Sequence, residues 1–391
     1  MNAYLKFSLV AMIAVSVVSD CMLLPFYPQF FASVFSVTDP QHVGFYLSAT
    51  SLAVMLAFPF WAAVARSVPV IRLLIYTQFA AGVLSIVCYW SDLLLDFWLV
   101  SLLMLVFKGS YLLIYPHIMS FEQKEKHSGT IGLLSVIVHL GAILGAGIGG
   151  FVLQLFEPRQ VFLLMSVGDF LQMLMCFFLV GKDKATTQEA HEEQQDKQEQ
   201  TAERLTPNPV YKLGLIMLVF YFSVWLIRPF FSRYWESVSA WNGEIISGLV
   251  FAIPGVIALL ALCLNKSRQG IIPALFLGIF GLLLQASEQE IIVLLGRCLY
   301  GWSLFQATVR LDVMLFELST PASYAADFSK IYFFQSLGAL IALFSVGSIV
   351  ASSGLQMPLI AGALGLALTV FLYTLLFKAE RKSANVIIET S

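Results

Sequence analysis

Six ionisable residues lie inside long apolar segments of this chain: Asp20, Lys108, His139, Asp169, Arg228 and Arg297. A charged side chain at bilayer depth costs about 2.5–3.5 kcal/mol on insertion scales, so each is a candidate functional residue. Carboxyl groups and imidazoles bind and release protons, whereas lysine and arginine hold anions. The set therefore predicts proton transfer, binding of a charged solute, or both.

Asp20 has the most suitable chemistry for proton coupling. Its carboxyl group could take a proton from one side of a membrane and release it to the other side or to a substrate. The alternative is a fixed ion pair with Lys108 that only holds two segments together. His139 could titrate near neutral pH, although a hydrogen-bonded packing histidine is the commoner outcome.

Two aromatic stripes each combine a cation with aromatic rings: the first is Lys108, Tyr111 and Tyr115, and the second is Tyr221, Trp225 and Arg228. Spacings of three and four residues place each group on one helix face. A substrate with carboxylates and an apolar or aromatic body would suit such a face. The alternative is packing of the rings in the core or against lipid, with the cation reaching towards the membrane surface. With Arg297, three cations stand against the carboxylate of Asp20, which favours an anionic or zwitterionic solute.

The densest run of glycines lies in one uninterrupted apolar segment and comprises Gly141, Gly145, Gly147, Gly149 and Gly150. An interior glycine costs a soluble helix about 1 kcal/mol relative to alanine. In a bilayer, small residues at helical spacing let two helix backbones approach closely. The run therefore predicts a membrane helix in tight contact with a neighbour, along a seam that permits sliding.

The composition places all these residues in a membrane protein. Hydrophobic residues make up 59% of the 391 positions and charged residues only 12%, too few to cover a soluble domain. A spanning helix needs roughly 20 apolar residues. The chain is therefore predicted to be an all-α membrane protein with twelve transmembrane helices, at 7–33, 43–65, 70–90, 97–119, 130–155, 160–181, 211–235, 245–264, 270–286, 290–311, 328–352 and 355–378.

A polar segment divides these spans into six and six. Residues 182–209 are charged and glutamine-rich, so they predict a solvated linker between a bundle over 1–181 and a bundle over 210–391. The halves also resemble each other, since Pro25-Phe-Tyr-Pro-Gln-Phe-Phe31 matches Pro229-Phe-Phe-Ser-Arg-Tyr-Trp235. Repeated halves are the usual build of a secondary transporter, with the substrate site at their interface.

Charge patterning and missing motifs narrow the function further. Basic residues gather at the span ends of one side, so both termini and the linker are predicted to be cytoplasmic, in a multi-pass protein of the cytoplasmic (inner) membrane. The sequence has no stripe of basic residues interleaved with aromatic ones, so it does not predict nucleic-acid binding. The five cysteines lie in apolar runs without a Cys-x-x-Cys pair, so no metal or cofactor is expected. We expect a monomer whose partners are the lipid bilayer, protons and a small-molecule substrate.

The layout of six spans, linker and six spans resembles the major facilitator superfamily over essentially the whole chain. The fifth-span sequence Gly141-x3-Gly145-Ala-Gly-Ile-Gly149-Gly150 resembles that family's antiporter motif, with Ala146 where proline is usual. In the tenth span, Arg297-x3-Gly301 resembles an Arg-x3-Gly motif normally found in the fourth span. The resemblance implies two pseudo-symmetric six-helix bundles that rock around a central site. The glycine run of the fifth span is then expected to meet the second half and to form a sliding seam between the two moving halves.

The resemblance also implies roles for the charged residues. In this family the first, fourth, seventh and tenth spans line the central cavity, and here each carries one candidate: Asp20, Lys108, Arg228 and Arg297. Sixth spans are usually peripheral, which makes proton transfer the less favoured role for Asp169. Arg297 has a second interpretation, in which it bonds backbone carbonyl groups across the central helices.

Two departures from the family pattern concern charges. The loop between the second and third spans keeps Arg66 and Arg72 but has no aspartate for the family's gating ion pair. In the fourth span, Leu105 stands where the motif's arginine would be, and Lys108 follows about one turn later.

The expected function is proton-driven export of a small organic solute by alternating access. An anionic or zwitterionic solute is favoured, for example a carboxylate metabolite or a carboxylate siderophore. Two alternatives share the fold: multidrug efflux of lipophilic compounds, and proton symport that imports a carboxylate. A membrane enzyme or a non-transporting sensor belongs to a different class. The sequence has no His-Glu-x-x-His, Gly-x-Ser-x-Gly or phosphate-binding glycine motif, and its polar linker is too short for a sensor domain.

Overall fold

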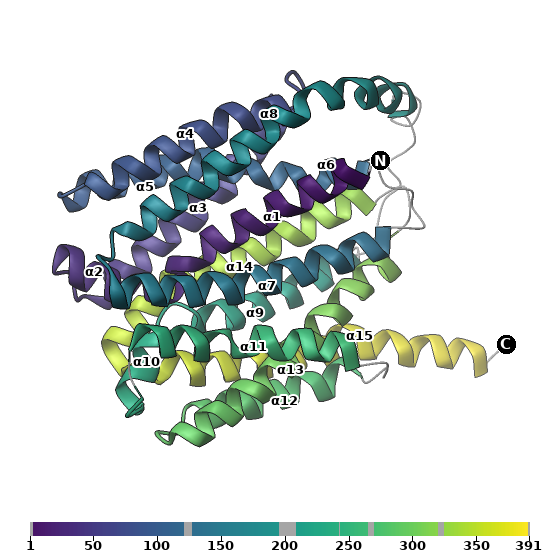
Figure 1. Cartoon of the computed structure of the whole chain (residues 1–391). Coiled ribbons are helices and arrows are strands. Elements are labelled where there is room, and N and C mark those ends of the chain that lie inside the picture. The colour runs from purple at the N-terminus through teal and green to yellow at the C-terminus, as the bar shows by residue number, and fades with distance from the viewer. Residues whose placement is uncertain are drawn as a thin grey trace. The chain divides into compact units, whose positions relative to one another are not determined.

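The computed structural model describes residues 3–120, 127–194, 209–241, 243–264, 270–319 and 324–389. These residues form helices joined by short connections, and none of them lies in a β-strand (Figure 1). The helices of the first half are α1 (Ala3–Leu23), α2 (Tyr27–Phe35), α3 (Pro40–Val64), α4 (Val70–Trp90), α5 (Leu94–Lys108), α6 (Ile114–Ser120), α7 (His127–Leu155) and α8 (Gln160–Gln194). Two short 3-10 helices join some of them, η1 (Leu24–Phe26) and η2 (Gly109–Leu113). Those of the second half are α9 (Pro209–Ile227), α10 (Phe231–Val238), α11 (Glu244–Leu264), α12 (Ile271–Gln285), α13 (Glu290–Leu318), α14 (Tyr324–Ser353) and α15 (Met357–Glu389).

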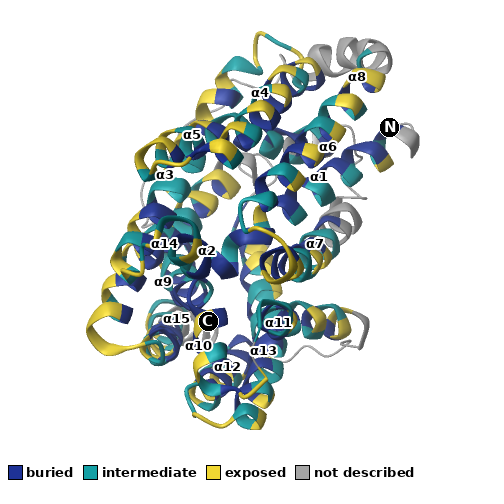
Figure 2. Cartoon of the chain, turned by 60° about the vertical axis from the view of Figure 1, so that its left-hand side comes forward, coloured by how far each residue is buried: buried dark blue, intermediate teal, exposed yellow. Residues whose placement is uncertain are grey.

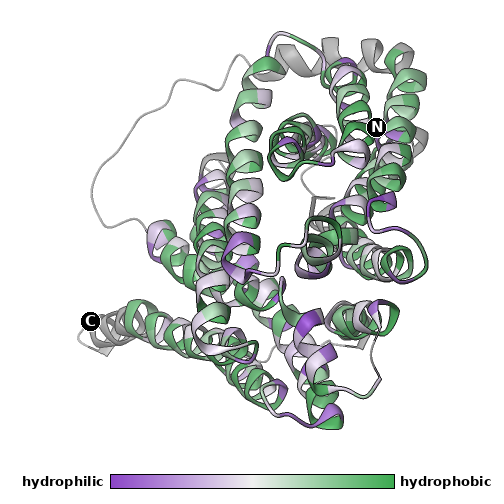
Figure 3. Ribbon diagram, turned by 90° about the vertical axis from the view of Figure 1, so that its left-hand side faces the viewer, coloured by the Kyte–Doolittle hydropathy of each residue, from purple (hydrophilic) through white to green (hydrophobic). Residues whose placement is uncertain are grey.

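Each predicted span corresponds to one helix or to consecutive helices. Among the described residues, eleven helical segments are long and apolar enough to cross a membrane, and α12 is a shorter apolar helix at the position of the predicted ninth span. Hydrophobic residues dominate these helices, and hydrophilic ones gather mainly near their ends and connections (Figure 3). Single helices carry both buried and exposed residues (Figure 2), and large apolar side chains such as Phe177 and Leu364 are exposed. Lipid would cover such side chains, so the all-α membrane fold is confirmed.

Helix α8 continues beyond the predicted sixth span. The apolar stretch ends near Val180, but the helix runs on to Gln194. Residues 195–208 of the predicted linker lie outside the described residues, and α9 begins at Pro209. The domain boundaries at 181 and 210 therefore stay predictions.

The helices gather into two compact units. One unit is built mainly from α1 to α8 and the other mainly from α9 to α15. Residues Asp39–Ser48, around the start of α3, group with the second unit, and Gly243–Leu249, at the start of α11, group with the first. Within the first unit α1 packs on α7 and α8, and α4 packs on α5 and α8. Within the second, α9 packs on α14 and α15, and α12 packs on α13 and α15. This recurrence of neighbours supports the pseudo-symmetry of the two bundles.

The first helix of each half is interrupted at a corresponding proline. Helix α1 ends just before Pro25 and α9 ends just before Pro229, and a short helix, α2 or α10, then continues each segment. Proline lacks an N–H group and clashes with the preceding turn, so it interrupts a helix. The residues before the short helices have nearly the same backbone angles: Phe26 has φ −120° and ψ 7°, and Phe230 has φ −108° and ψ 3°. The sequence match thus reflects a repeat of local structure.

The glycine-rich helix α7 packs closely against α1 within the first unit. A Cβ atom added to Gly145 would lie 2.6 Å from the carbonyl oxygen of Val18. Gly141 faces the same turn of α1, and one added to Gly149 would overlap the backbone of Met22. A side chain at these positions would push the two helices apart. The contact is as close as the glycine pattern predicts. Its main partner, however, is α1 of the same half, whereas the sequence predicted a seam against the second half.

The other glycines of the run behave differently. Gly150 lies against the backbone of Glu244, in the part of α11 that groups with the first unit. Gly248 lies against the carbonyl oxygen of Ala146 in the same way. An added Cβ atom on Gly147 would meet nothing within 4 Å. The run therefore has a tightly packed face towards α1, a second contact with the start of α11, and an open position at Gly147.

Candidate functional site

Lys108 is the centre of a charged cluster in the first unit. It is the last residue of α5, and its Nζ atom lies 3.7 Å from Oδ1 of Asp20 on α1. The same Nζ atom lies 3.5 Å from Oδ1 of Asp169 on α8. One ammonium group thus serves two carboxyl groups from two different helices. We refer to Asp20, Lys108 and Asp169 as the triad.

The three members of the triad differ in burial. The side chain of Asp20 is 34% exposed, whereas the side chains of Lys108 and Asp169 are 2% and 0% exposed. A buried charge is tolerated when it is paired and hydrogen bonded. Lys108 and Asp169 therefore form the buried pair, and Asp20 is the member of the triad that a proton or a solute can reach.

Polar side chains of neighbouring helices support the buried end of the triad. Ser85 on α4 donates its hydroxyl hydrogen to Oδ2 of Asp169 at 3.1 Å. Nearby along the same helices, Ser16 on α1 donates to Oε1 of Gln172 on α8 at 2.7 Å. These hydrogen bonds fix α4, α8 and α1 against one another where the charges lie. Sequence reasoning did not single out these polar residues. The pattern that indicates them is that Asp169 and Gln172 lie three residues apart, and so on one helix face, within an apolar span.

The first predicted aromatic stripe lies beside the triad. Tyr111 is in η2, immediately after α5, and hydrogen bonds to Asp20. Tyr111 and Tyr115 also pack against an apolar cluster that includes residues of α1. The rings therefore contact both a charged group and the core, and their role in substrate binding stays a prediction. His139 is half-buried on α7, and its role in proton transfer also stays a prediction.

The second predicted stripe comes together in the second unit. The guanidinium carbon of Arg228 lies 4.6 Å from the centre of the Trp225 ring, a cation–π contact. Tyr221 lies within electrostatic reach of Arg228 and of Asp312 on α13. Asp312 is exposed. This part of the second unit thus presents one cation and one carboxyl group among aromatic rings.

Arg297 bonds a proline-interrupted turn of α11. Its Nη2 atom donates to the carbonyl oxygen of Phe251 at 2.7 Å, and its Nε atom donates to that of Val250 at 3.4 Å. Val250 lies four residues before Pro254, which has no N–H group to offer it. The guanidinium also lies over the ring of Phe231, 3.7 Å from its centre. Arg297 thus supplies a donor to Val250, whose helical partner the proline removes, and a second one to the adjacent carbonyl group of Phe251.

The glycine of the Arg-x3-Gly pattern contacts the same turn. A Cβ atom on Gly301 would lie 2.6 Å from Cα of Pro254, so the glycine lets α13 approach α11 closely. Arg297 and Gly301 together form a clasp around Pro254. These contacts correspond to the backbone-bonding interpretation of Arg297, and binding of substrate by Arg297 stays a prediction.

The clasp predicts a thermodynamic cycle between Arg297 and Pro254. Arg297→Ala should lower the stability of the protein by about 3 kcal/mol, because buried carbonyl groups lose their donors. Pro254→Ala restores an N–H group for Val250, so Arg297→Ala should cost less in that background. Melting temperatures of the purified protein in detergent, for both single variants and the double variant, check this result. Equal costs in the two backgrounds would contradict the clasp.

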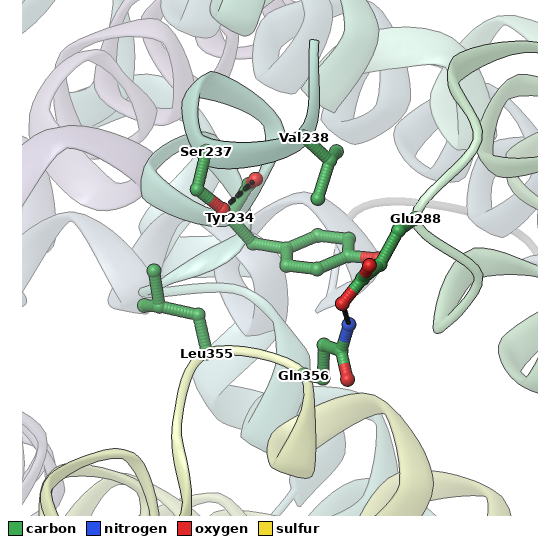
Figure 4. Close-up of a pocket in the computed structure, with 6 residues that line it drawn as sticks. All are labelled: Tyr234, Ser237, Val238, Glu288, Leu355 and Gln356. Carbon is green, nitrogen blue, oxygen red and sulfur yellow. Dashed lines mark hydrogen bonds between the residues drawn. The ribbon is translucent and has the colours of Figure 1, made fainter.

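A surface pocket of about 450 Å³ lies elsewhere in the second unit, between the end of α10 and the loops α12–α13 and α14–α15 (Figure 4). Glu288 accepts a hydrogen bond there from Nε2 of Gln356 at 2.9 Å. The hydroxyl of Tyr234 is directed to the backbone oxygens of Gln285 and Ser287. The pocket contains no residue of the triad, the stripes or the clasp, so we assign it no role in transport.

Comparison with known proteins identifies the family. The sequence model described as Major Facilitator Superfamily matches residues 9–286, more than half of the chain. The chain belongs to the Major Facilitator Superfamily. It is therefore a multi-pass membrane protein of a transporter family, in agreement with the resemblance found in its sequence.

Individual superfamily members agree with this assignment. The Multi-drug resistance efflux pump PmrA of Streptococcus pneumoniae serotype 4 is 25% identical over 342 residues, which cover 83% of each chain. A bacterial homologue of the human lysosomal transporter Spinster, in an inward-facing and occupied conformation, superposes with a TM-score of 0.76 at 11% identity, over 96% of this chain and 97% of that chain. A D-xylose-proton symporter gives a TM-score of 0.72 at 13% identity, over 95% of this chain and 98% of that chain. At such identities the solved structures show the fold alone.

Proposed function

We propose that this superfamily member exports a small organic solute from the cytoplasm in exchange for protons, by alternating access. The observation that carries the proposal is Asp20, a partly exposed carboxyl group in a membrane-spanning segment, 3.7 Å from a buried lysine. A proton on Asp20 removes its charge, so occupation by a proton and occupation by a solute cation exclude each other at this side chain. Such competition at one carboxyl group is sufficient to couple two opposite fluxes.

Two observations support export over import. The fifth-span glycine run resembles the antiporter motif, and it packs closely against α1, the helix that carries Asp20. The curated relatives are named as a multi-drug resistance efflux pump and a multidrug resistance protein. Import of a carboxylate by proton symport is the competing direction, and it would use the same carboxyl group.

The charges favour a zwitterionic or amphipathic solute of low net charge. The ammonium group of Lys108 is shared by two carboxyl groups, and the guanidinium of Arg297 is occupied by backbone oxygens. Among the described residues, Arg228 is thus the cation of the predicted set that has neither a carboxylate nor a backbone oxygen as a partner, and it lies over the ring of Trp225. Fewer cations are therefore available to bind an anionic solute than the three that were counted in the sequence.

Two substrate classes fit that balance. A carboxylate metabolite or siderophore fits when it is zwitterionic. Multidrug efflux of lipophilic compounds is the second candidate, supported by the names of the relatives. In either case the transporter is proposed to act as a monomer in the cytoplasmic membrane, with cytoplasmic termini, and to use no cofactor and perform no chemistry on its solute.

Asp20→Asn tests the proposed function. The variant cannot be charged, so proton-linked export should fall to the level of cells that lack the transporter, and one solute should accumulate in the cytoplasm. A metabolite comparison between wild-type and variant cells identifies that solute, and proton release from inverted vesicles on its addition then measures coupling. Asp92→Asn is the matched control, because Asp92 is 84% exposed and lies in the α4–α5 connection. Wild-type export by the Asp20 variant would contradict the proposal.

A further inference from the structure

We infer that Asp169 is a positioning residue that holds Lys108 in place when Asp20 is neutral, and that it thereby sets the pH range of transport. This inference rests on the proposed proton coupling at Asp20. It gives the second carboxyl group of the triad a role distinct from that of a proton carrier.

The first observation is that the buried negative charge of Asp169 is compensated by Lys108. Its side chain is 0% exposed, and its Oδ2 atom accepts the hydrogen bond from Ser85. Its Oδ1 atom has no hydrogen-bond partner among the described residues, and the charged group near it is Lys108 Nζ at 3.5 Å. A buried carboxylate that loses its cation is strongly disfavoured. Lys108 is therefore retained beside Asp169 whenever Asp169 is charged.

The second observation is the asymmetry of access within the triad. Asp20 is the exposed carboxyl group, with 34% of its side chain accessible against 0% for Asp169. A proton or a solute can therefore take Asp20 away from Lys108 without uncovering a buried charge. Asp169 remains as the counter-ion, so Lys108 need not move or lose its proton.

Two further titratable side chains lie by the triad in the part of the chain that the structure describes, and neither adds a charge. Tyr111 of η2 hydrogen bonds to Asp20, and the thiol of Cys88 on α4 lies within electrostatic reach of Lys108. Both side chains are neutral at physiological pH. With both carboxyl groups ionised the triad carries one net negative charge, and a proton on Asp20 brings it to zero. Because like charges disfavour each other, the charge on Asp169 makes proton uptake by Asp20 easier.

The test is the pH profile of transport by Asp169→Asn. In this variant Lys108 serves Asp20 alone, so Asp20 should stay ionised to lower pH. The midpoint of the pH profile should therefore move to more acidic pH by about one unit, with transport recovered at the acidic end. Ser85→Ala weakens the hold on the Asp169 charge, so it should move the midpoint in the same direction by less. Asp169→Glu keeps the charge and should keep the wild-type midpoint.

Ser166→Ala is the control for packing, because it removes a buried hydroxyl that bonds to Leu163 within the same helix, without changing a charge. Its midpoint should equal that of the wild type. An unmoved midpoint in Asp169→Asn would overturn the inference, as would loss of transport at every pH in a correctly folded Asp169→Asn protein, which would make Asp169 a proton carrier. Proton-linked export that survives Asp20→Asn would instead overturn the proposed function.

Discussion

Replacing Lys108 with methionine is expected to leave little folded protein. Asp169 is fully buried, and Lys108 Nζ is the cation beside its Oδ1 atom. Removing one member of a buried ion pair costs about 3–5 kcal/mol, because the other charge stays in the interior without compensation. Such a cost is a large part of the stability of a typical protein, about 5–15 kcal/mol. The yield of monodisperse protein after detergent extraction, measured by size-exclusion chromatography, checks this result.

A second substitution separates the charge effect from the loss of the side chain. The double variant Lys108→Met with Asp169→Leu leaves no buried charge in the triad, so its yield should return towards that of the wild type. Proton-linked transport should remain absent, because the cation beside Asp20 is still missing. A double variant that folds as poorly as Lys108→Met would contradict the ion-pair explanation.

Gly145→Val is expected to abolish transport and to lower stability. The valine Cβ atom would lie 2.6 Å from the carbonyl oxygen of Val18 and 2.8 Å from Cβ of Cys21, so α1 and α7 would have to separate. Overpacking of this kind costs about 1–3 kcal/mol or more. It also displaces the helix that carries Asp20. Transport in vesicles and the melting temperature of the purified protein measure the two effects.

The same helix provides a matched control in Gly147→Val. This variant introduces the same side chain with the same helix propensity, but an added Cβ atom there meets nothing within 4 Å. Its transport and melting temperature should be close to those of the wild type. Similar losses in both valine variants would indicate that glycine is needed in α7 for its backbone, and would contradict the packing explanation.

The helices could be predicted because the information for each of them is local. A stretch of apolar residues of sufficient length determines its own span, and polar or proline-containing segments determine the breaks. The same reasoning found the repeat, since the proline–phenylalanine steps before α2 and α10 impose nearly the same backbone angles. The course of α8 was less predictable, because its last turns up to Gln194 are polar and hydropathy does not mark them as helix.

The site was predicted only in part, because it depends on how helices are rotated about their axes. An ion pair of Asp20 with Lys108 is one of the two interpretations that the sequence allows, and the structure contains this pair. The approach of Asp169 to the same lysine was not foreseen, since no spacing along the chain relates α5 to α8. In the same way, the sequence suggested that Arg297 could bond carbonyl groups, but only the packing of α13 on α11 identifies Pro254 as the reason.

The clasp around Pro254 has a consequence for biogenesis. Helix α11 leaves the ribosome before α13, so the carbonyl oxygen of Val250 enters the membrane before its donor, Arg297, exists. An unsatisfied carbonyl group in lipid costs several kcal/mol, so the newly inserted α11 is an incomplete helix. Its final shape depends on a guanidinium that arrives two helices later. We therefore expect α11 to reach its final form only after α13 has been inserted, and not in the order of synthesis.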